Sequence, residues 1–383
     1  MYRAASPVSL QRRFFMDAKY KKLAEELKKQ ILDQQKTGLY KLPSEKAIGE
    51  YYRVSRQTVR GALRLLQAEG LIEKRKGSGS YATGLSPVSS ENRVALLLRA
   101  PEEYLYPSLI SDISTRLKER GYTMQVYATD GHFDTERRLL LSLLSGPLHG
   151  LIAEPCHTAM PSPNLDLYEQ LRSRGTSVLF LGAFHGAPPG SVFLKSGDYK
   201  GGYEAARYLL SKNHTRIGGI FQADQLSGLE RCHGFFAAMR DFQMPLPDEQ
   251  ILLFTQTDLA ALESRCDTGF LTLFIRRQLK DCTAVICQND EIAYWLAKEL
   301  TLAGFQIPDD INLLSFDNSY LSDMGPVRIS SLSLPSHEPG NTAASMLLQM
   351  MQGASVHSKE LPFTLSAKGS SSGIPGASAP GSF

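Results

Sequence analysis

Short apolar runs alternate with longer amphipathic stretches through most of the chain, and this alternation restricts the possible folds more than any other feature. The apolar runs are RVALLL, TMQVYAT, GLIAEP, SVLFLG, RIGGIF, ILLF, AVICQ and INLLSF, all between residues 93 and 316. Strands that alternate with helices of about 10–15 residues form βαβ units around a parallel sheet. About eight or nine strands are expected here, which favours two doubly wound lobes over residues 93–368.

The preceding segment, residues 18–83, has a different pattern. KYKKLAEELKKQI, starting at Lys19, has the apolar spacing of a first amphipathic helix. Ser44 can cap a helix that begins at Glu45, and Ser55 can cap another that runs to about Glu69. Two short helices joined by a tight turn form a helix-turn-helix, and LIEKRKGSGSYA after them indicates a β-hairpin with a basic tip. We therefore expect a small α+β winged-helix domain.

Charge is divided unevenly between these two regions. Residues 1–84 contain 18 Lys and Arg against 8 Asp and Glu, whereas the rest of the chain contains 24 against 31. Four arginines lie three or four residues apart, a spacing that would align them on one face of a helix: Arg53, which precedes Ser55, and Arg56, Arg60 and Arg64, which follow it. A basic module on an acidic body is typical of a nucleic-acid-binding domain joined to a domain of another kind.

The run LPSEKAIGEYYRVSRQTVRGALRLLQAEGLIEKRKGSGSYA resembles the winged helix of the GntR family of bacterial transcription regulators. The resemblance implies a homodimer that binds pseudo-palindromic operator DNA through the second helix and the wing. The DNA-contacting residues that it implies are Lys46, Ser55, Arg56, Thr58, Arg60, Lys76 and Gly77. Arg53 and Arg64, farther from the helix tip or turned away from it, are expected to supply mainly a positive field.

Several polar residues follow apolar runs in the large region, where open α/β sheets bind ligands. Glu154 follows GLIA, Asp290 follows AVICQN and Asp317 follows INLLSF, while LERCHGFF adds Arg231. Carboxylates, amides and an arginine that meet in one cleft suit a ligand whose hydroxyls both donate and accept hydrogen bonds.

Residues 92–368 resemble the effector domain of the LacI family, which is similar to periplasmic sugar-binding proteins. The blocks that carry the resemblance are ADQLSGLERCHGF, QNDEIA and LLSFDNS. The resemblance implies that Arg231, Asn289 and Asp317 bind the hydroxyls of a small effector and that Asp290 helps to hold the site. Tyr106 and Glu154 complete the expected set of effector-binding residues. Two simpler interpretations remain open, because Asn289 and Asp317 can cap helices and Tyr106 can be a packing residue.

A GntR-type winged helix joined to a LacI-type body also resembles the arabinose-operon repressors of Gram-positive bacteria. ERRLLLSLLS, HGLIAEP and YKGGYEAARYLLS add to this likeness. The chain departs from that group's pattern at Ser227, where a Gln is expected, and at Gly197, where an acid is expected. A sugar effector that releases the protein from DNA is therefore predicted, with arabinose first and a non-sugar metabolite such as a purine as the alternative.

The remaining sequence features narrow the class of protein. The alternative to a regulator that only binds its ligand is an enzyme domain fused to a winged helix. The sequence does not favour it, since the chain has no G-x-S-x-G, H-E-x-x-H or phosphate-binding glycine motif. We expect no catalytic residues, no cofactor and no metal site, since five scattered cysteines form no C-x-x-C pair. Without an apolar run of about 18 residues or a signal peptide, the protein is expected in the cytoplasm and off the membrane.

The expected domain boundaries follow from composition. Residues 1–17 lack periodicity and are expected to be disordered or a misassigned start, and residues 84–92 are a Ser-, Gly- and Pro-rich linker. The last segment, residues 369–383, is rich in the same residues and is expected to be a disordered tail.

Overall fold

The computed structural model describes residues 20, 22–28, 42–68, 72–75, 79–82, 92–102, 104–245, 248–279 and 281–371. It divides into two compact units, residues 1–89 and residues 90–383. The point of division lies inside the expected linker, of which only Asn92 is described.

The N-terminal unit is a helix-turn-helix followed by a two-stranded sheet. Residues 20 and 22–28 are helical. The elements after them are α2 (Glu45–Tyr51), α3 (Arg56–Ala68), β1 (Ile72–Arg75) and β2 (Gly79–Ala82). The strands are antiparallel, with Ile72 opposite Ala82. The expected wing is therefore present as a strand pair, but its tip, residues 76–78, lies outside the described residues.

Both predicted helix caps in this unit are confirmed. Ser44 Oγ accepts the N–H of Ala47 at 3.2 Å, and Ser55 Oγ accepts the N–H of Thr58 at 3.2 Å. Each bond satisfies a backbone donor that the first turn of a helix leaves free. Buried apolar side chains, mostly from the helices and from β1, form one small core: Leu23, Ala24, Leu27, Leu42, Ile48, Val59, Ala62, Leu63, Leu66 and Ile72.

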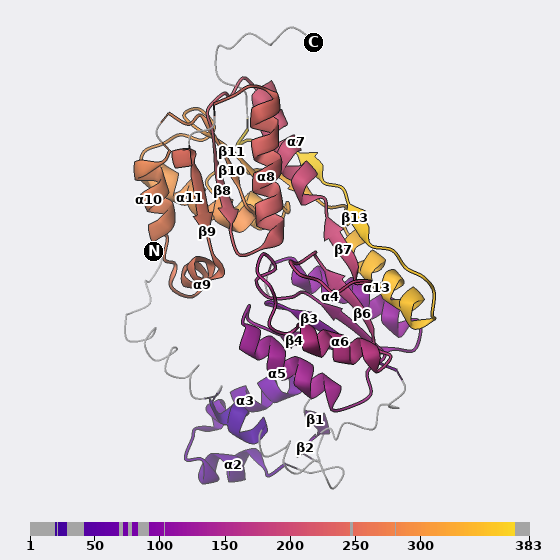
Figure 1. The fold of residues 1–383 in the computed structure, drawn as a ribbon. Coiled ribbons are helices and arrows are strands. Elements are labelled where there is room, and N and C mark those ends of the chain that lie inside the picture. Colours follow the sequence, from indigo (N-terminus) through magenta and orange to yellow (C-terminus); the bar gives the residue numbers. More distant parts are fainter. Residues whose placement is uncertain are drawn as a thin grey trace. The chain divides into compact units, whose positions relative to one another are not determined.

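The second unit consists of two α/β lobes (Figure 1). The first lobe contains a parallel sheet in the order β13-β7-β6-β5-β3-β4. Its strands are β3 (Arg93–Leu98), β4 (Thr123–Ala128), β5 (Gly150–Ala153), β6 (Ser177–Leu181), β7 (Val192–Ser196) and β13 (Lys359–Leu361). Helices α4 (Tyr106–Lys118) and α13 (Glu338–Met351) pack on one core of this lobe, and α5 (Phe133–Leu144) and α6 (Leu165–Ser173) pack on the other.

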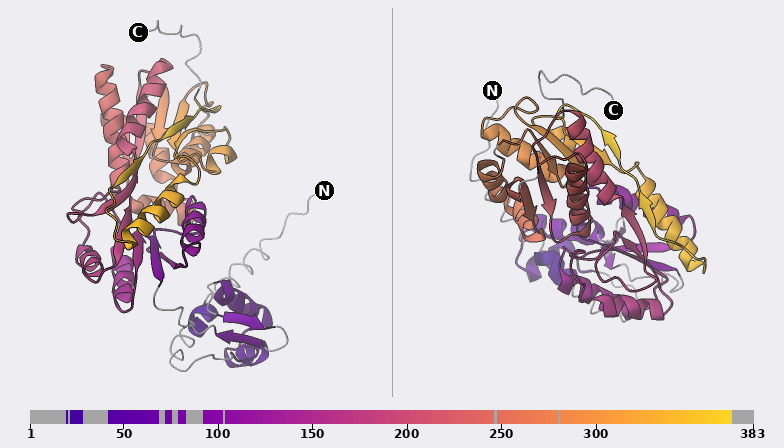
Figure 2. Two further views of the ribbon diagram at one scale, coloured as in Figure 1. Left: turned by 90° about the vertical axis from the view of Figure 1, so that its right-hand side faces the viewer. Right: turned by 45° about the horizontal axis from the view of Figure 1, so that its top comes forward.

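The second lobe repeats this plan, with the order β14-β12-β11-β10-β8-β9. Its strands are β8 (Ile217–Gln222), β9 (Ile251–Phe254), β10 (Ala284–Cys287), β11 (Asn312–Phe316), β12 (Ser330–Ser333) and β14 (Thr364–Ser366), which is antiparallel to β12. Its helices are α7 (Asp198–Ser211), α8 (Leu226–Asp241), the 3-10 helix η2 (Asp248–Gln250), α9 (Gln256–Arg265), α10 (Gly269–Arg277), α11 (Asp290–Leu302) and α12 (Leu321–Met324). Helices cover both faces of each sheet (Figure 2).

Two features of the topology determine where a ligand can bind. The first five strands of each lobe are arranged 2-1-3-4-5 in chain order, so the order reverses beside β3 in the first lobe and beside β8 in the second. Crevices form at such reversal points, outside the carboxyl ends of the strands. The chain also passes between the lobes three times, after β7, after β12 and after β13.

The prediction of two doubly wound lobes is confirmed, but the predicted number of strands, eight or nine, is too low. The described residues of the second unit contain twelve strands, because β7, β12, β13 and β14 were missed. β13 and β14 have only three residues each, and β12 has the sequence SSLS. Ser330 and Ser331 of this strand are buried because their hydroxyls find partners inside the protein, which hydrophobic periodicity does not reveal.

The expected tail also begins too early. Ser370 and Ser371 are buried, and Ser370 Oγ donates to the carbonyl of Leu313 at 2.6 Å and accepts the N–H of Ser330 at 2.8 Å. Serine-rich composition predicted disorder, but here each hydroxyl both donates and accepts within the second lobe. Residues 372–383 and 1–19 lie outside the described part of the chain.

Within the described residues no helix is long and apolar enough to cross a membrane. The same residues contain no group of three or more His, Cys, Asp or Glu side chains that could hold a metal ion.

Candidate functional site

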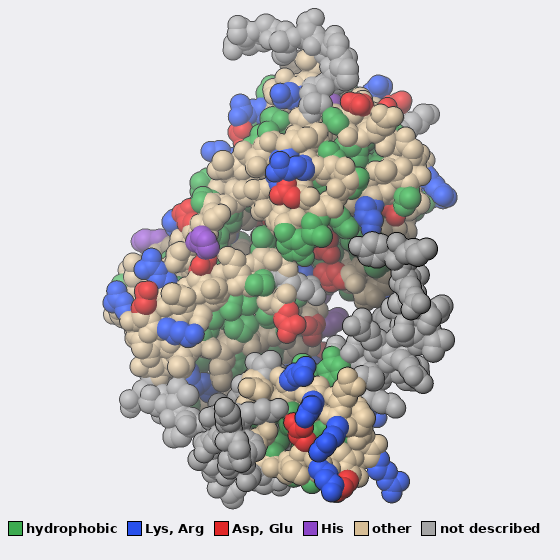
Figure 3. Space-filling view, turned by 180° about the vertical axis from the view of Figure 1, so that it is seen from behind, with side chains coloured by type: hydrophobic (Ala, Val, Ile, Leu, Met, Phe, Trp, Pro, Cys, Tyr) green, Lys and Arg blue, Asp and Glu red, His purple; other side chains and the backbone are tan. Residues whose placement is uncertain are grey.

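The start of α3, the second helix of the helix-turn-helix, is exposed and positively charged. Arg56 and Arg60 are exposed, as are Arg53 in the preceding turn and Arg64 one turn later. Figure 3 shows Lys and Arg side chains gathered in a row on this unit. Arg53 has a φ of 51°, so the turn between α2 and α3 places a left-handed residue at this edge.

Two acidic side chains of α2 hold cations of this face. Arg60 Nε lies 2.9 Å from Glu45 Oε2, and Lys46 Nζ lies 3.9 Å from Glu50 Oε1. Both cations remain well exposed, because 60% of the Arg60 side chain and 75% of the Lys46 side chain are accessible. The Glu45 contact fixes the direction of Arg60 while leaving donors of its guanidinium for another acceptor.

Thr58 differs from the other predicted DNA-contacting residues. It is only 5% exposed, and its hydroxyl lies 2.9 Å from Ser55 Oγ. Its side chain therefore supports the cap of α3 from inside the unit. Lys76 and Gly77, predicted in the wing, lie outside the described residues.

A pocket of about 540 Å³ lies between the two lobes of the second unit. It is lined from the carboxyl ends of β3, β5, β8 and β10 and from the segments that pass between the lobes. Five of the six predicted effector-binding residues line it: Tyr106, Glu154, Arg231, Asn289 and Asp317. The structure thus brings together side chains that are up to 211 positions apart in the sequence, from Tyr106 to Asp317.

Arg231 is the most firmly held of these residues. Its Nε donates to Asp198 Oδ1 at 2.7 Å, and its Nη1 donates to the carbonyl of Gln288. The guanidinium lies 4.2 Å from the ring centre of Phe316. Burial works against the charged guanidinium, but Asp198 and Asp317 raise the pKa of Arg231 overall. An arginine oriented in this way can present its remaining N–H groups to a ligand.

Asp317 sits beside Arg231 in strained backbone. Its φ is 96° and that of Asn318 is 50°, an unusual pair for residues other than glycine. Burial raises the pKa of Asp317 to about 6, although Arg231 acts to lower it. Asp317 does not cap a helix, since α12 begins only at Leu321. Backbone strain of this kind persists only where the surrounding contacts hold it in place. It occurs most often at binding sites.

Tyr106 and Glu154 form a hydrogen-bonded pair in the first lobe. The Tyr106 hydroxyl donates to Glu154 Oε2 at 2.8 Å, and the backbone N–H of Arg99 donates to the same oxygen at 3.1 Å. Burial and the neighbouring Glu154 hold the pKa of Tyr106 well above its usual value. The pair offers a ligand a carboxylate oxygen and the face of an aromatic ring.

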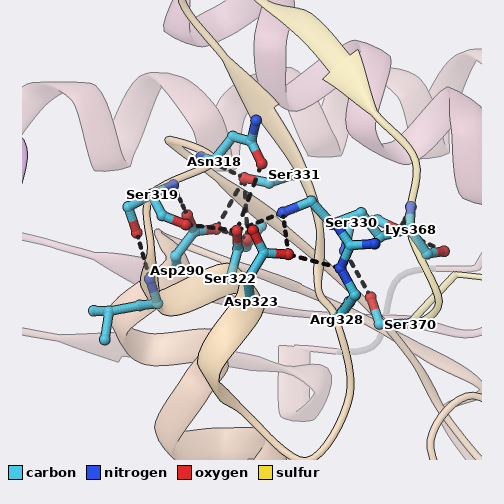
Figure 4. Close-up of polar contacts among 12 residues, drawn as sticks. Asp290, Asn318, Ser319, Ser322, Asp323, Arg328, Ser330, Ser331, Lys368 and Ser370 are labelled. Carbon is cyan, nitrogen blue, oxygen red and sulfur yellow. Dashed lines mark hydrogen bonds and ion pairs between the residues drawn. The ribbon is translucent and has the colours of Figure 1, made fainter.

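Asn289 lines the pocket, whereas its neighbour Asp290 is buried and does not. Asn289 caps α11, since its Oδ1 accepts the N–H of Ile292 at 3.0 Å, while its amide group also lines the pocket. Asp290 is fully buried and does not line the pocket. Its carboxylate accepts hydrogen bonds from the hydroxyls of Ser315 and Ser331 and from the N–H of Ser319 (Figure 4). Asp290 thus holds the loop that carries Asp317 and Asn318, in keeping with the supporting role implied by the resemblance.

Sequence reasoning missed several pocket residues. They are Arg99, Tyr104, Gln222, Gln256, Gln288 and Asn318. His337 and Asp112 also line the pocket, and His337 Nδ1 lies 3.0 Å from Asp112 Oδ1. Arg99, Gln222 and Gln288 each stand at or just past the end of an apolar run, so the rule that found Glu154 could have found them. Gln256 is 7% exposed, and its Oε1 has no hydrogen-bond partner, which leaves a buried acceptor at the pocket wall.

Direct contacts join the lobes around this pocket. Arg99 Nη1 lies 3.0 Å from Glu263 Oε1, and the N–H of Asp290 donates to the Tyr104 hydroxyl at 3.3 Å. His157 Nδ1 lies 3.0 Å from Asp224 Oδ2. The lobes are therefore closed on each other, and opening the cleft requires these bonds to break.

Comparisons with known proteins agree with this division of the chain. Residues 19–81 match the family of bacterial regulatory proteins named gntR, and residues 206–371 match the periplasmic binding protein-like domain. The chain therefore joins a GntR-type helix-turn-helix region to a periplasmic-binding-protein-like domain.

Two relatives span nearly the whole chain. The arabinose metabolism transcriptional repressor of Halalkalibacterium halodurans is 29% identical over 88% of this chain and 90% of its own length. The repressor of the same name from Geobacillus stearothermophilus is 28% identical over 88% of this chain and 92% of its own. A solved structure of the transcriptional regulator CelR with cellobiose has a TM-score of 0.65 at 18% identity, covering 86% of this chain and all of that chain. It shares the fold.

Proposed function

We propose that this chain, with its GntR-type helix-turn-helix region and its periplasmic-binding-protein-like domain, is a transcriptional repressor of carbohydrate-utilisation genes. It binds pseudo-palindromic operator DNA as a homodimer and is released when a small sugar enters the pocket between the lobes. L-Arabinose is the first candidate, because two relatives that each cover 88% of the chain are named for arabinose metabolism. The protein acts by binding and not by chemical conversion of its ligand.

The observation that carries this proposal is the constrained pair of Arg231 and Asp317 at the pocket wall. A fixed guanidinium donates hydrogen bonds and a neighbouring carboxylate accepts them, so together they match vicinal hydroxyl groups. Glu154 and Asn289 add an acceptor and an amide from opposite lobes. A ligand that contacts both lobes stabilises the closed arrangement of the lobes. Because it binds the closed state better than the open state, it shifts the equilibrium towards the closed state.

On the DNA side, the proposed contacts are Ser55, Arg56 and Arg60 at the start of α3 and Lys46 on α2, with Lys76 and Gly77 in the wing. Arginine can donate two hydrogen bonds to a guanine edge in the major groove, while the capped start of a helix suits phosphate. Thr58 acts through Ser55, because its own side chain is buried.

The experiment is a linked binding measurement with full-length protein. Operator sequences are first selected from random duplex DNA, and DNA affinity is then measured by fluorescence anisotropy with and without L-arabinose. The proposal expects the sugar to weaken operator binding and the operator to weaken sugar binding by the same factor. Equal sugar affinity with and without operator would contradict the release mechanism.

A thermal-shift panel of pentoses, hexoses, disaccharides and nucleobases tests the ligand class. A ligand at 100 times its dissociation constant stabilises the folded protein by about 2.7 kcal/mol, which gives a clear shift. Stabilisation by a purine alone would replace the sugar with the other ligand class and leave the regulator unchanged.

A further inference from the structure

A second chamber of about 250 Å³ lies next to the pocket between the lobes. The two share part of their lining, including Tyr106, Glu154, Ser196, Ser227 and Arg231. Ser227, the second residue of α8, has a short side chain that lines both chambers. The first chamber alone measures about 540 Å³. Pockets of about 300–1,000 Å³ typically enclose drug-sized ligands. A free monosaccharide is only about half the size of such a ligand, so the first chamber already has room for one.

The walls of the second chamber indicate what fills it. Four leucines line it without reaching the first chamber: Leu181, Leu194, Leu226 and Leu361. Glu230 and Asp198 add carboxylates, and Lys195 adds a cation. An apolar wall with a few polar groups suits a sugar ring, which has an apolar face and polar edges.

The charges argue against a phosphorylated ligand. Each of three cations along the chambers already pairs with a carboxylate: Arg99 with Glu263 at 3.0 Å, Arg231 with Asp198 at 2.7 Å, and Lys195 with Glu360 at 3.0 Å. Glu154, Glu230 and Asp317 add further acidic groups. Burial raises the pKa of Glu230, as expected where negative charge is poorly solvated. A phosphate would add two more negative charges to this surface.

Resting on the proposed function, we propose that the preferred effector is a neutral disaccharide that contains L-arabinose or a related sugar, with that sugar at Arg231 and Asp317 and the second ring in the leucine-walled chamber. Ser227 is then a specificity-determining residue, because its small side chain keeps the two chambers joined.

The test compares each disaccharide with the monosaccharide that it contains, and adds one phosphate ester. Isothermal titration of the full-length protein is carried out with L-arabinose, arabinobiose, D-glucose, cellobiose and glucose-6-phosphate. We expect the best disaccharide to bind at least tenfold more tightly than its own monosaccharide. A monosaccharide or the phosphate ester that binds as tightly as every disaccharide would overturn the inference and leave the sugar-responsive repressor standing. If none of the five binds, the sugar effector of the proposed function falls too.

Two variants locate the second ring. Ala183 lines only the second chamber, so Ala183→Leu should lower disaccharide affinity at least tenfold and leave monosaccharide affinity within twofold. Ala187→Leu, on the same loop but lining neither chamber, is the matched control. Ser227→Gln should remove the preference for the disaccharide by closing the join. Unchanged disaccharide affinity in both Ala183→Leu and Ser227→Gln would rule out occupancy of the second chamber.

Discussion

Thr158 of the first lobe caps a helix of the second lobe: its Oγ1 accepts the N–H of Leu226, the first residue of α8, at 2.8 Å. The same hydroxyl donates to Gln225 Oε1 at 2.7 Å. Gln225 occupies the N-cap position of α8 but makes no side-chain capping bond itself. The helix that carries Arg231 therefore has its first turn completed only when the lobes are closed.

This relationship predicts that Thr158→Val weakens effector binding without unfolding the protein. The variant keeps the shape of the side chain but removes two hydrogen bonds that exist only between closed lobes, a loss of about 1–2 kcal/mol and roughly 5- to 30-fold in affinity. Titration calorimetry and small-angle scattering with saturating ligand measure the loss. Thr115→Val, which removes only a bond within α4, is the control and should bind normally. Wild-type affinity in Thr158→Val would show that this cap plays no part in closure.

Arg231 and Asp198 should be coupled in stability as well as in binding. Arg231→Gln leaves the carboxylate of Asp198 buried without its cation, which costs about 3–5 kcal/mol in the free energy of unfolding. Asp198→Asn together with Arg231→Gln should recover part of that loss, because no buried charge then lacks a partner. Urea unfolding measures both. Arg240→Gln, in an exposed pair at the end of the same helix, should leave stability unchanged. Additive losses in the double variant would contradict the coupling.

Asp317 gives a prediction for pH. Its pKa in the folded protein is raised to about 6 from a usual value of 3.8, so the folded state holds this proton more tightly than the unfolded state does. Stability relative to Asp317→Asn is therefore greatest below about pH 4, falls as pH rises towards 6, and is constant above about pH 7. The difference is about 2–3 kcal/mol. Urea unfolding of both proteins between pH 4 and pH 8 measures it, and parallel curves would show that Asp317 titrates normally.

The sequence was most informative where a single local rule applies. Ser44 and Ser55 were recognised as caps because a hydroxyl before a helical pattern has one common use. Glu154 and Asp317 were found because each follows an apolar strand, and ligands bind beyond the carboxyl ends of the strands in open α/β sheets.

Long-range polar contacts could not be read in the same way. Ser331 and Ser370 look like loop residues, and only their partners Asp290 and Leu313, far away in sequence, make them part of the interior. The capping role of Thr158 depends on Leu226 in the other lobe. Thr58 was expected at the DNA, but the Ser55 cap turns its side chain inwards. A single sequence contains no pattern that pairs such residues.

The last prediction concerns Arg60, which Glu45 holds from α2. Arg60→Ala should reduce discrimination between operator and random DNA by about 1–3 kcal/mol, because a base contact carries sequence information. Arg64→Ala, on the same helix, is the matched control and should weaken binding to both DNAs equally, as loss of a general positive charge does. Glu45→Gln should strengthen binding to all DNA by removing a competing anion while losing part of the discrimination. Salt titrations of anisotropy with both DNAs separate the two effects. Equal loss on operator and random DNA in Arg60→Ala would assign this arginine to phosphate and leave base recognition to Arg56.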